Sequence, residues 1–213
     1  MFESAGEVLG MKLLVLGASG RTGRHVVEQA LRRGHEVTAL VRPGAALPVG
    51  TGLTIAPGNP CDRDQLDQLM DGQNAVISCL GQRSTADAVL LRGSAEALIA
   101  VMTKTDVRRL VVISQGLLFP TSSVVVRLLR LALARHVEDS TAMEALLRGS
   151  ELDWTIVRPP RLTEQDEMRG YRLAVDEMPE GRRVMSRADL AACLLDEIDQ
   201  EAHLRAVVGV TSK

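Results

Sequence analysis

The chain has 213 residues, a formal net charge of −2, and 46% hydrophobic against 24% charged residues, which are the proportions of one ordinary globular domain. Aromatic residues make up only 2% of the chain. A nucleic-acid-binding surface needs a basic patch, and base stacking needs aromatic side chains. Composition and charge therefore exclude nucleic acid as an expected partner.

The sequence leads us to expect neither a targeting segment nor a metal motif. No apolar run approaches the roughly 20 residues of a transmembrane helix. Residues 1–10 contain Glu3 and Glu7 and lack a basic start, so we expect an N-terminal extension rather than a signal peptide. Cys61, Cys79 and Cys193 form no CxxC pair, which argues against a disulfide framework or a zinc site. We expect a cytoplasmic protein with neither a bound metal nor a membrane partner.

Short apolar runs alternate with amphipathic segments from Met11 onward. The run 12–17 predicts a strand, residues 22–33 a helix, and the β-branched run 36–41 a second strand. The same alternation predicts strand 53–56, helix 63–70, strand 74–79, helix 84–104, strand 109–114, helical residues 122–149 and strand 153–158. Continuous apolar strands between amphipathic helices predict an α/β fold, a doubly wound parallel sheet of the Rossmann type.

Regularity falls after Pro159 and Pro160. Residues 160–185 are expected to be loops on the substrate side of the fold, with short strands near 171–176 and 183–185. Ser186 is a good N-cap for a helix over 187–199, and 205–210 predicts a last strand. Residues 11–213 are thus expected to form a single Rossmann domain with a small C-terminal lobe of loops, short strands and a helix.

The strongest local motif is GASGRTG, which lies between the first predicted strand and the first predicted helix. In this context Gly17 permits a tight turn, Gly20 lets the backbone approach a pyrophosphate, and Gly23 lets the helix pack closely on the sheet. Amide groups at the start of the helix can then bind phosphate oxygens. The expected cofactor-binding residues of this loop are Gly17, Ala18, Ser19, Gly20, Arg21 and Thr22.

Arg42 indicates which dinucleotide binds. An NAD site usually has Asp or Glu at the end of the second strand, where it holds the ribose 2′-hydroxyl. Here Arg42 follows Val41, and a guanidinium pairs with a 2′-phosphate that a carboxylate would repel. Arg21 supplies a second positive charge. The sequence therefore predicts NADP(H) as the cofactor, with Arg42 at its 2′-phosphate.

Two further segments follow strands whose carboxyl ends should face the same ligand. Residues 79–83 end the fourth predicted strand, and residues 113–116 end the fifth. Ligands of open α/β sheets collect outside the carboxyl ends of the strands. We expect Leu80 and Gly81 to pass along the cofactor, and Ser114 or Gln115 to face the nicotinamide. Cys79 is interpreted as a packed small hydrophobe rather than a nucleophile.

Over residues 11–200 the chain resembles the atypical short-chain dehydrogenase/reductases of the NAD(P)H-binding, NmrA-like group, and within it the biliverdin-IXβ reductase/flavin reductase branch. The resemblance is carried by GASGRTG, VTALVRP, VISCLGQR, MEALLRGSELDWTIVRPPRL and RVMSRADLA. It implies NADPH bound across the sheet, with contacts from residues 17–22, Arg42, Leu80, Gly81, Arg83 and Pro159. Relatives often have Gly-Asp where this chain has Gly58 and Asn59, whose side-chain oxygen can still accept a hydrogen bond from the adenine amino group.

The usual proton donor of short-chain dehydrogenases cannot be assembled from this sequence. Those enzymes use a Tyr-x-x-x-Lys pair, in which the lysine lowers the pKa of the phenol. The only tyrosine, Tyr171, is followed four residues later by Val175, and no lysine lies between positions 105 and 212. Alignment places His136 at the usual tyrosine position. His136 and Gln115 are the candidate catalytic residues, as groups that polarise a substrate.

These features predict an NADPH-dependent oxidoreductase that transfers hydride to a conjugated acceptor, such as a flavin or a linear tetrapyrrole. Hydride transfer to such an acceptor needs positioning more than a strong acid. Two alternatives stay open: a non-catalytic NADP(H)-sensing regulatory protein of the NmrA type, and a biosynthetic tailoring reductase whose pocket residues 160–185 define. A small molecule is the expected partner, and the protein is expected to be a monomer or a small homo-oligomer.

Overall fold

A computed structural model describes residues 10–82, 87, 89–164 and 167–213, so the expected cofactor contact Arg83 lies outside the described residues. The fold is built on an eight-stranded sheet with the order β3-β2-β1-β4-β5-β6-β10-β8. The strands are β1 (Lys12–Leu16), β2 (Glu36–Val41), β3 (Leu53–Pro57), β4 (Ala75–Ser78), β5 (Arg109–Ile113), β6 (Asp153–Arg158), β8 (Tyr171–Val175) and β10 (Ala206–Ser212). β10 and β8 pair antiparallel, whereas the other neighbouring strands pair parallel. Its first six strands follow the doubly wound nucleotide-binding order, which confirms the predicted fold class.

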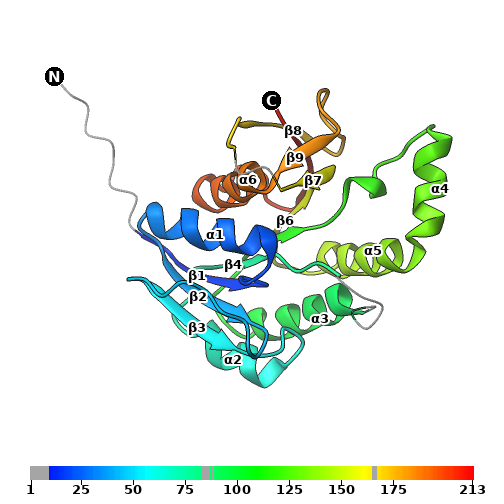
Figure 1. Cartoon of the computed structure of the whole chain (residues 1–213). Helices are drawn as coiled ribbons and strands as arrows, with labels where there is room; N and C mark the ends of the chain where they lie inside the picture. The colour runs from blue at the N-terminus through cyan, green and yellow to red at the C-terminus, as the bar shows by residue number, and fades with distance from the viewer. Residues whose placement is uncertain (1–9, 83–86, 88, 165–166) are drawn as a thin grey trace.

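Helices cover both faces of this sheet. They are α1 (Arg21–Arg32), α2 (Arg63–Met70), α3 (Leu90–Met102), α4 (Val124–Ala132), α5 (Ala134–Arg148) and α6 (Arg187–Gln200). Figure 1 shows α1 and α6 on one side of the sheet and α2, α3 and α5 on the other. A separate apolar core lies on each side, and each core contains residues of the helices on that side.

The central strand β1 shows why the sheet needs this double cover. Leu13 and Val15 belong to the core under α1 and α6, while Leu14 and Leu16 belong to the opposite core. Successive side chains of a strand point to opposite faces, and all four of these side chains are fully buried. Burial of each contributes about 1.5–3 kcal/mol, so both layers of helices stabilise β1 directly.

The predicted helical stretch 122–149 is two helices. The chain leaves helical geometry at Leu133, with φ −107° and ψ 25°, between α4 and α5. Figure 1 shows α4 projecting away from the sheet, and none of its residues is buried. It exposes large apolar side chains instead, including Val125 and Leu131.

The C-terminal lobe contains one strand more than the sequence predicted. β7 (Arg161–Thr163) pairs with β9 (Val184–Ser186) in a separate two-stranded sheet, while β8 joins the far edge of the main sheet. The Ser186 hydroxyl accepts a hydrogen bond from Asp189 N at 3.0 Å, so this serine is the helix cap that the sequence indicated. Within the described residues, no helix combines the length and apolar character needed to cross a membrane.

Candidate cofactor site

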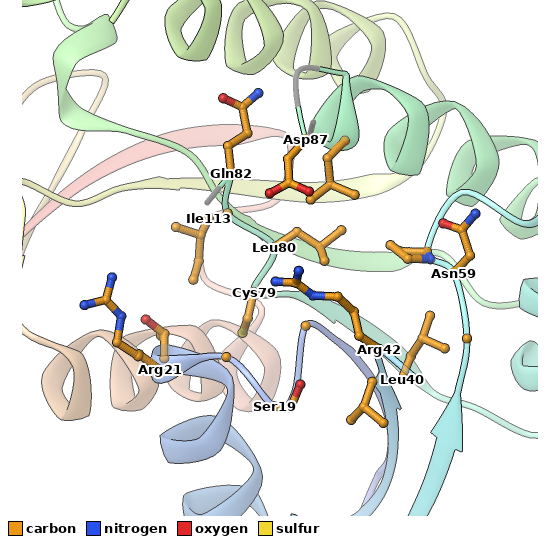
Figure 2. A pocket seen from close by; sticks show the side chains of 18 of the residues that line it. Ser19, Arg21, Leu40, Arg42, Asn59, Cys79, Leu80, Gln82, Asp87 and Ile113 are labelled. Atoms are coloured by element: carbon orange, nitrogen blue, oxygen red, sulfur yellow. The ribbon is translucent and has the colours of Figure 1, made fainter. Parts of the chain in front are cut away.

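A cavity of about 470 Å³ opens at the carboxyl ends of the central strands (Figure 2). This is the edge at which doubly wound sheets bind ligands, beside the point where the strand order reverses between β1 and β4. Its volume lies in the range of pockets that hold small molecules and cofactors. The lining residues are Gly17, Ser19, Gly20, Arg21, Thr22, Leu40, Val41, Arg42, Pro43, Gly58, Asn59, Pro60, Cys79, Leu80, Gly81, Gln82, Asp87, Leu90, Ile113, Leu162 and Arg187.

The glycine loop after β1 forms the floor of the cavity. Gly17 has φ +71°, a left-handed conformation that glycine adopts at no steric cost, and its carbonyl accepts a hydrogen bond from Gly20 N at 2.8 Å. A Cβ on Gly23 would lie 2.2 Å from the Gly17 carbonyl oxygen. Only glycine fits there, so α1 can start directly against the loop, as the motif predicts.

The start of α1 suits an anion. Its N-cap, Gly20, provides no side-chain capping hydrogen bond, and the first turn contains no acidic residue. In α2, by contrast, the Asp62 carboxylate accepts hydrogen bonds from Asp64 N and Gln65 N. The uncapped amides and the positive end of the helix dipole both favour a negative group. The glycine loop and this helix start therefore fit the pyrophosphate of a dinucleotide.

Arg42 stands in the wall next to this loop. It follows β2 directly, and Figure 2 shows its side chain extending into the cavity. Arg24 supports the same wall from α1, because its guanidinium donates to Ser19 O at 3.2 Å and to Ala46 O at 3.3 Å. These two bonds fasten the glycine loop to the segment that follows Arg42.

The far end of the cavity is formed by Gly58, Asn59 and Pro60 (Figure 2). Gly58 leaves room for a buttressing glutamine, because a Cβ there would lie 1.9 Å from the Gln65 side-chain oxygen. The Asn59 side-chain oxygen accepts a hydrogen bond from Cys61 N at 3.0 Å. That oxygen therefore already holds a turn, and its second lone pair is the one that could meet an adenine.

Aliphatic side chains line the remaining wall. Leu80, Ile113 and Leu162 come from the ends of β4 and β5 and from β7, and together they offer a surface against which a flat ring can pack. Cys79 lies beside them. Cys79 is half-buried, and desolvation disfavours its thiolate and raises its pKa to about 12.

Several residues predicted for this site are not part of the described cavity lining. Ala18 is fully buried, the Pro159 carbonyl accepts a hydrogen bond from Gly116 N at 2.8 Å, and the Ser114 hydroxyl donates to Glu144 Oε1 at 2.6 Å. The last contact turns Ser114 away from the cavity and into the protein.

The two candidate catalytic residues contact each other and are not part of the described cavity lining. The Gln115 amide nitrogen donates to the His136 carbonyl at 3.0 Å and to the Ser140 hydroxyl at 2.8 Å. Neither Gln115 nor His136 is among the described lining residues. These contacts give Gln115 the role of a link between the end of β5 and α5.

Tyr171, the tyrosine of the chain, has a structural contact with α6. Its hydroxyl donates to Asp196 Oδ2 at 2.6 Å, on the helix α6, and the described cavity lining does not include it. Burial, followed by the bond to Asp196, raises the pKa of this phenol. Tyr171 therefore fastens β8 to α6.

Lining residues that the sequence analysis did not predict for the site include Asp87, Leu162 and Arg187. Leu162 and Arg187 reach the cavity because β7 pairs with β9, in the register Leu162 opposite Met185. Arg187 lies within the segment RVMSRADLA, but no local pattern shows that its side chain faces a cavity. Among the described residues, no cluster of three or more His, Cys, Asp or Glu side chains could hold a metal ion.

Comparisons with known proteins agree with this geometry. Residues 17–201 match the model of the NAD(P)H-binding family. The chain is 29% identical over 226 residues to the oxidoreductase stcQ of Emericella nidulans, covering 91% of this chain and 80% of that protein. It is 28% identical over 153 residues to the photosystem II assembly factor Ycf39 of a Synechocystis species, covering 70% of this chain but only 44% of that protein.

A solved structure from Streptococcus pneumoniae TIGR4, which carries the name of an NADH-flavin reductase, superposes with a TM-score of 0.79. It is 28% identical in sequence, and the match covers 96% of this chain and all 100% of that chain. The family match spans the glycine loop, the Arg42 wall, the aliphatic wall and Arg187. The chain belongs to the NAD(P)H-binding family, and its cofactor is a nicotinamide dinucleotide.

Proposed function

We propose that this protein is an NADPH-dependent reductase that delivers hydride to a flat conjugated acceptor, such as a flavin or a linear tetrapyrrole. The observation that carries the proposal is the cavity wall at the end of β2, where Arg42 extends inward from a strand end that has no carboxylate. An ionised guanidinium can form two parallel hydrogen bonds to a 2′-phosphate. This favours NADPH over NADH.

The acceptor class follows from what the cavity can supply. The bound cofactor would provide the hydride. The chain's own residues hold it: the glycine loop and the start of α1 at the pyrophosphate, Arg42 at the 2′-phosphate, and Gly58 with Asn59 at the adenine. Leu80, Ile113 and Leu162 then exclude water and offer an apolar surface to a flat ring.

Proton supply is the second argument for a conjugated acceptor. A simple carbonyl substrate needs an acid at its oxygen, and the single tyrosine of the chain is bonded to Asp196 outside the cavity lining. An extended conjugated acceptor spreads the charge that hydride transfer creates, so solvent can supply the proton. The similarity to the oxidoreductase stcQ and to the protein named as an NADH-flavin reductase supports the same class of reaction.

The direct test is to mix the protein with NADPH and either FMN or biliverdin and to follow the loss of NADPH absorbance. We expect turnover with at least one of these acceptors, and slower turnover when NADH replaces NADPH at equal concentration. Absence of turnover with every conjugated acceptor would overturn the proposal.

A non-catalytic NADP(H)-binding regulator is the second candidate. The similarity to a photosystem II assembly factor favours it, and a binding protein would not need a proton donor either. Such a protein would bind NADP⁺ and NADPH comparably, show no turnover, and retain a partner protein in pull-down experiments.

A further inference from the structure

An ion-pair cluster lies at the glycine-loop end of the cavity, and the proposed function assigns no role to two of its members, Glu164 and Arg187. Arg21 of the loop and Arg187 of α6 both line the cavity. Their Nη1 atoms lie 2.5 Å and 2.9 Å from the same oxygen, Glu164 Oε1. Figure 2 shows Arg21 at the opposite end of the cavity from Asn59, so the cluster adjoins the loop that fits phosphate.

Arg187 is an unusual residue for its position. It is the first residue of α6, where the helix dipole disfavours a positive charge, and only 10% of its side chain is exposed. Asp189 in the same helical turn does not compensate, because its carboxylate accepts hydrogen bonds from Arg169 N, Gly170 N and the Ser212 hydroxyl. A buried cation placed in this way needs an anion close by.

Glu164 provides this negative charge for Arg187 only in part. Its side chain is 65% exposed, and its single charge is shared between two guanidinium groups, which leaves one positive charge in excess. Burial and the neighbouring Arg21 both lower the pKa of Arg187. Desolvation and like-charge repulsion are thus only partly relieved in this arrangement.

We propose that Arg21 and Arg187 form an anion site for ligand phosphate, and that Glu164 occupies this site until a phosphate displaces it. The inference rests on the proposed function, because the cavity must bind a phosphorylated ligand. Phosphate oxygens suit two converging guanidinium groups better than one carboxylate oxygen does, since they offer more acceptors and more charge. When phosphate binds, the Glu164 carboxylate loses its two guanidinium partners, Arg21 and Arg187.

Two sources of phosphate are compatible with this chemistry, the pyrophosphate of the dinucleotide and the phosphate of an acceptor such as FMN. Calorimetric titration of the wild-type protein and its variants with NADP⁺ tests the first source without turnover. The ratio of KM for FMN to KM for riboflavin tests the second, because the two flavins differ in the phosphate.

The decisive variant is Glu164→Gln, which removes the competing charge while keeping the size of the side chain. We expect NADP⁺ to bind about two- to fivefold more tightly, the size of effect that one partly exposed ion pair allows. Glu167→Gln is the matched control, because Glu167 is similarly exposed (66%) and pairs with Arg169 instead. Arg187→Ala should weaken binding about tenfold or more, with circular dichroism as the check that the variant folds.

The outcomes separate the two proposals. A tighter NADP⁺ complex in Glu164→Gln supports the cofactor as the source, and a lower KM for FMN alone supports the acceptor. Unchanged or weaker binding of both ligands in Glu164→Gln overturns the inference. Wild-type protein that binds NADP⁺ but reduces no acceptor would refute the reductase and leave the anion site standing, whereas binding of neither ligand would refute both.

Discussion

The Arg158 guanidinium donates hydrogen bonds to both oxygens of the Glu144 carboxylate, with Nε 2.9 Å from Oε1 and Nη2 2.5 Å from Oε2. Both side chains are at most 10% exposed. The same carboxylate accepts the Ser114 hydroxyl at 2.6 Å, so one buried acid on α5 ties together the ends of β5 and β6. This arrangement directs Ser114 away from the cofactor cavity.

Glu144→Ala should therefore be strongly destabilising. It would leave the buried Arg158 guanidinium without its counter-ion and Ser114 without its acceptor, and breaking a buried pair on one side costs about 3–5 kcal/mol. Urea denaturation would measure the free energy of unfolding. Arg148→Ala is the control, because Arg148 is 48% exposed and lies 3.8 Å from Glu144 Oε2; it should cost about 1 kcal/mol or less. Equal losses in the two variants would contradict this account.

A second prediction concerns the glycine loop. In Gly23→Ala the new methyl group would meet the Gly17 carbonyl oxygen at 2.2 Å, so α1 must shift away from the loop. Thermal unfolding without any ligand should show a clear loss of stability, of the order of the 1–3 kcal/mol typical of overpacking. NADP⁺ affinity should fall as well.

Gly50→Ala is the control for that experiment. A Cβ on Gly50 would have no neighbour within 4 Å, and Gly50 is not among the glycines with positive φ. Its Tm should match that of the wild type or exceed it slightly, because alanine restricts the unfolded chain. A Gly23→Ala protein as stable as Gly50→Ala would show that the helix start tolerates displacement.

The parts of the site that could be predicted are those encoded locally. The glycine loop needs particular residues at fixed spacing between a strand and a helix, and Arg42 needs only its place at a strand end, so a linear reading finds both. The fold class, a doubly wound parallel sheet, followed from the same alternation, because parallel strands with helical crossovers have few alternative arrangements.

The parts that could not be predicted depend on contacts between distant segments. Arg187 and Leu162 reach the cavity only through the pairing of β7 with β9. A strand of three residues is too short to give a recognisable sequence pattern. Ser114 and Gln115 follow β5 directly, and their side chains point toward hydrogen-bond partners on α5, Glu144 and Ser140, that the sequence pattern does not reveal. The position of a residue on a strand can be predicted from the sequence. The direction of its polar side chain depends on a hydrogen-bond partner elsewhere in the chain.

The choice between the two nicotinamide cofactors gives a third prediction. Arg42→Ala should weaken NADPH binding about tenfold to a hundredfold, because a charge-assisted hydrogen bond contributes about 1.5–3 kcal/mol, and should leave NADH binding nearly unchanged. Arg32→Ala is the control, since Arg32 is 64% exposed and pairs with Glu28 on the surface of α1. Fluorescence titration with each cofactor measures the difference. Parallel losses for both cofactors would show that Arg42 does not contact a 2′-phosphate.

The cysteine thiols give a prediction that depends on pH. The pKa of Cys79 is raised to about 12 by burial, so its reactive thiolate is scarce at neutral pH. At pH 8 iodoacetamide should label Cys79 about three orders of magnitude more slowly in the native protein than in urea, where an ordinary thiol pKa of about 8.5 applies. Mass spectrometry of peptides would give both rates.

The raised pKa of Cys79 determines how the labelling rates change with pH. Above an ordinary thiol pKa the labelling rate in urea levels off, while the native rate keeps rising about tenfold per pH unit until the raised pKa is reached. Stability should fall over the same range, because the unfolded chain loses the Cys79 proton first. Native labelling of Cys79 as fast as labelling in urea would show an accessible thiolate in the cavity.

The last prediction contrasts two leucines on the neighbouring helices α4 and α5. Leu131 on α4 is 74% exposed, whereas Leu147 on α5 is fully buried under the sheet. Leu147→Ala should lower the free energy of unfolding by about 2–5 kcal/mol, since it removes packed methyl groups and leaves a cavity. Leu131→Ser should change it by about 0.5 kcal/mol or less, because water already surrounds that side chain in the single chain. Urea denaturation at two protein concentrations would measure the free energy of unfolding of both variants. A large, concentration-dependent loss of stability in Leu131→Ser would contradict the prediction. It would mean that the apolar face of α4 is covered in solution.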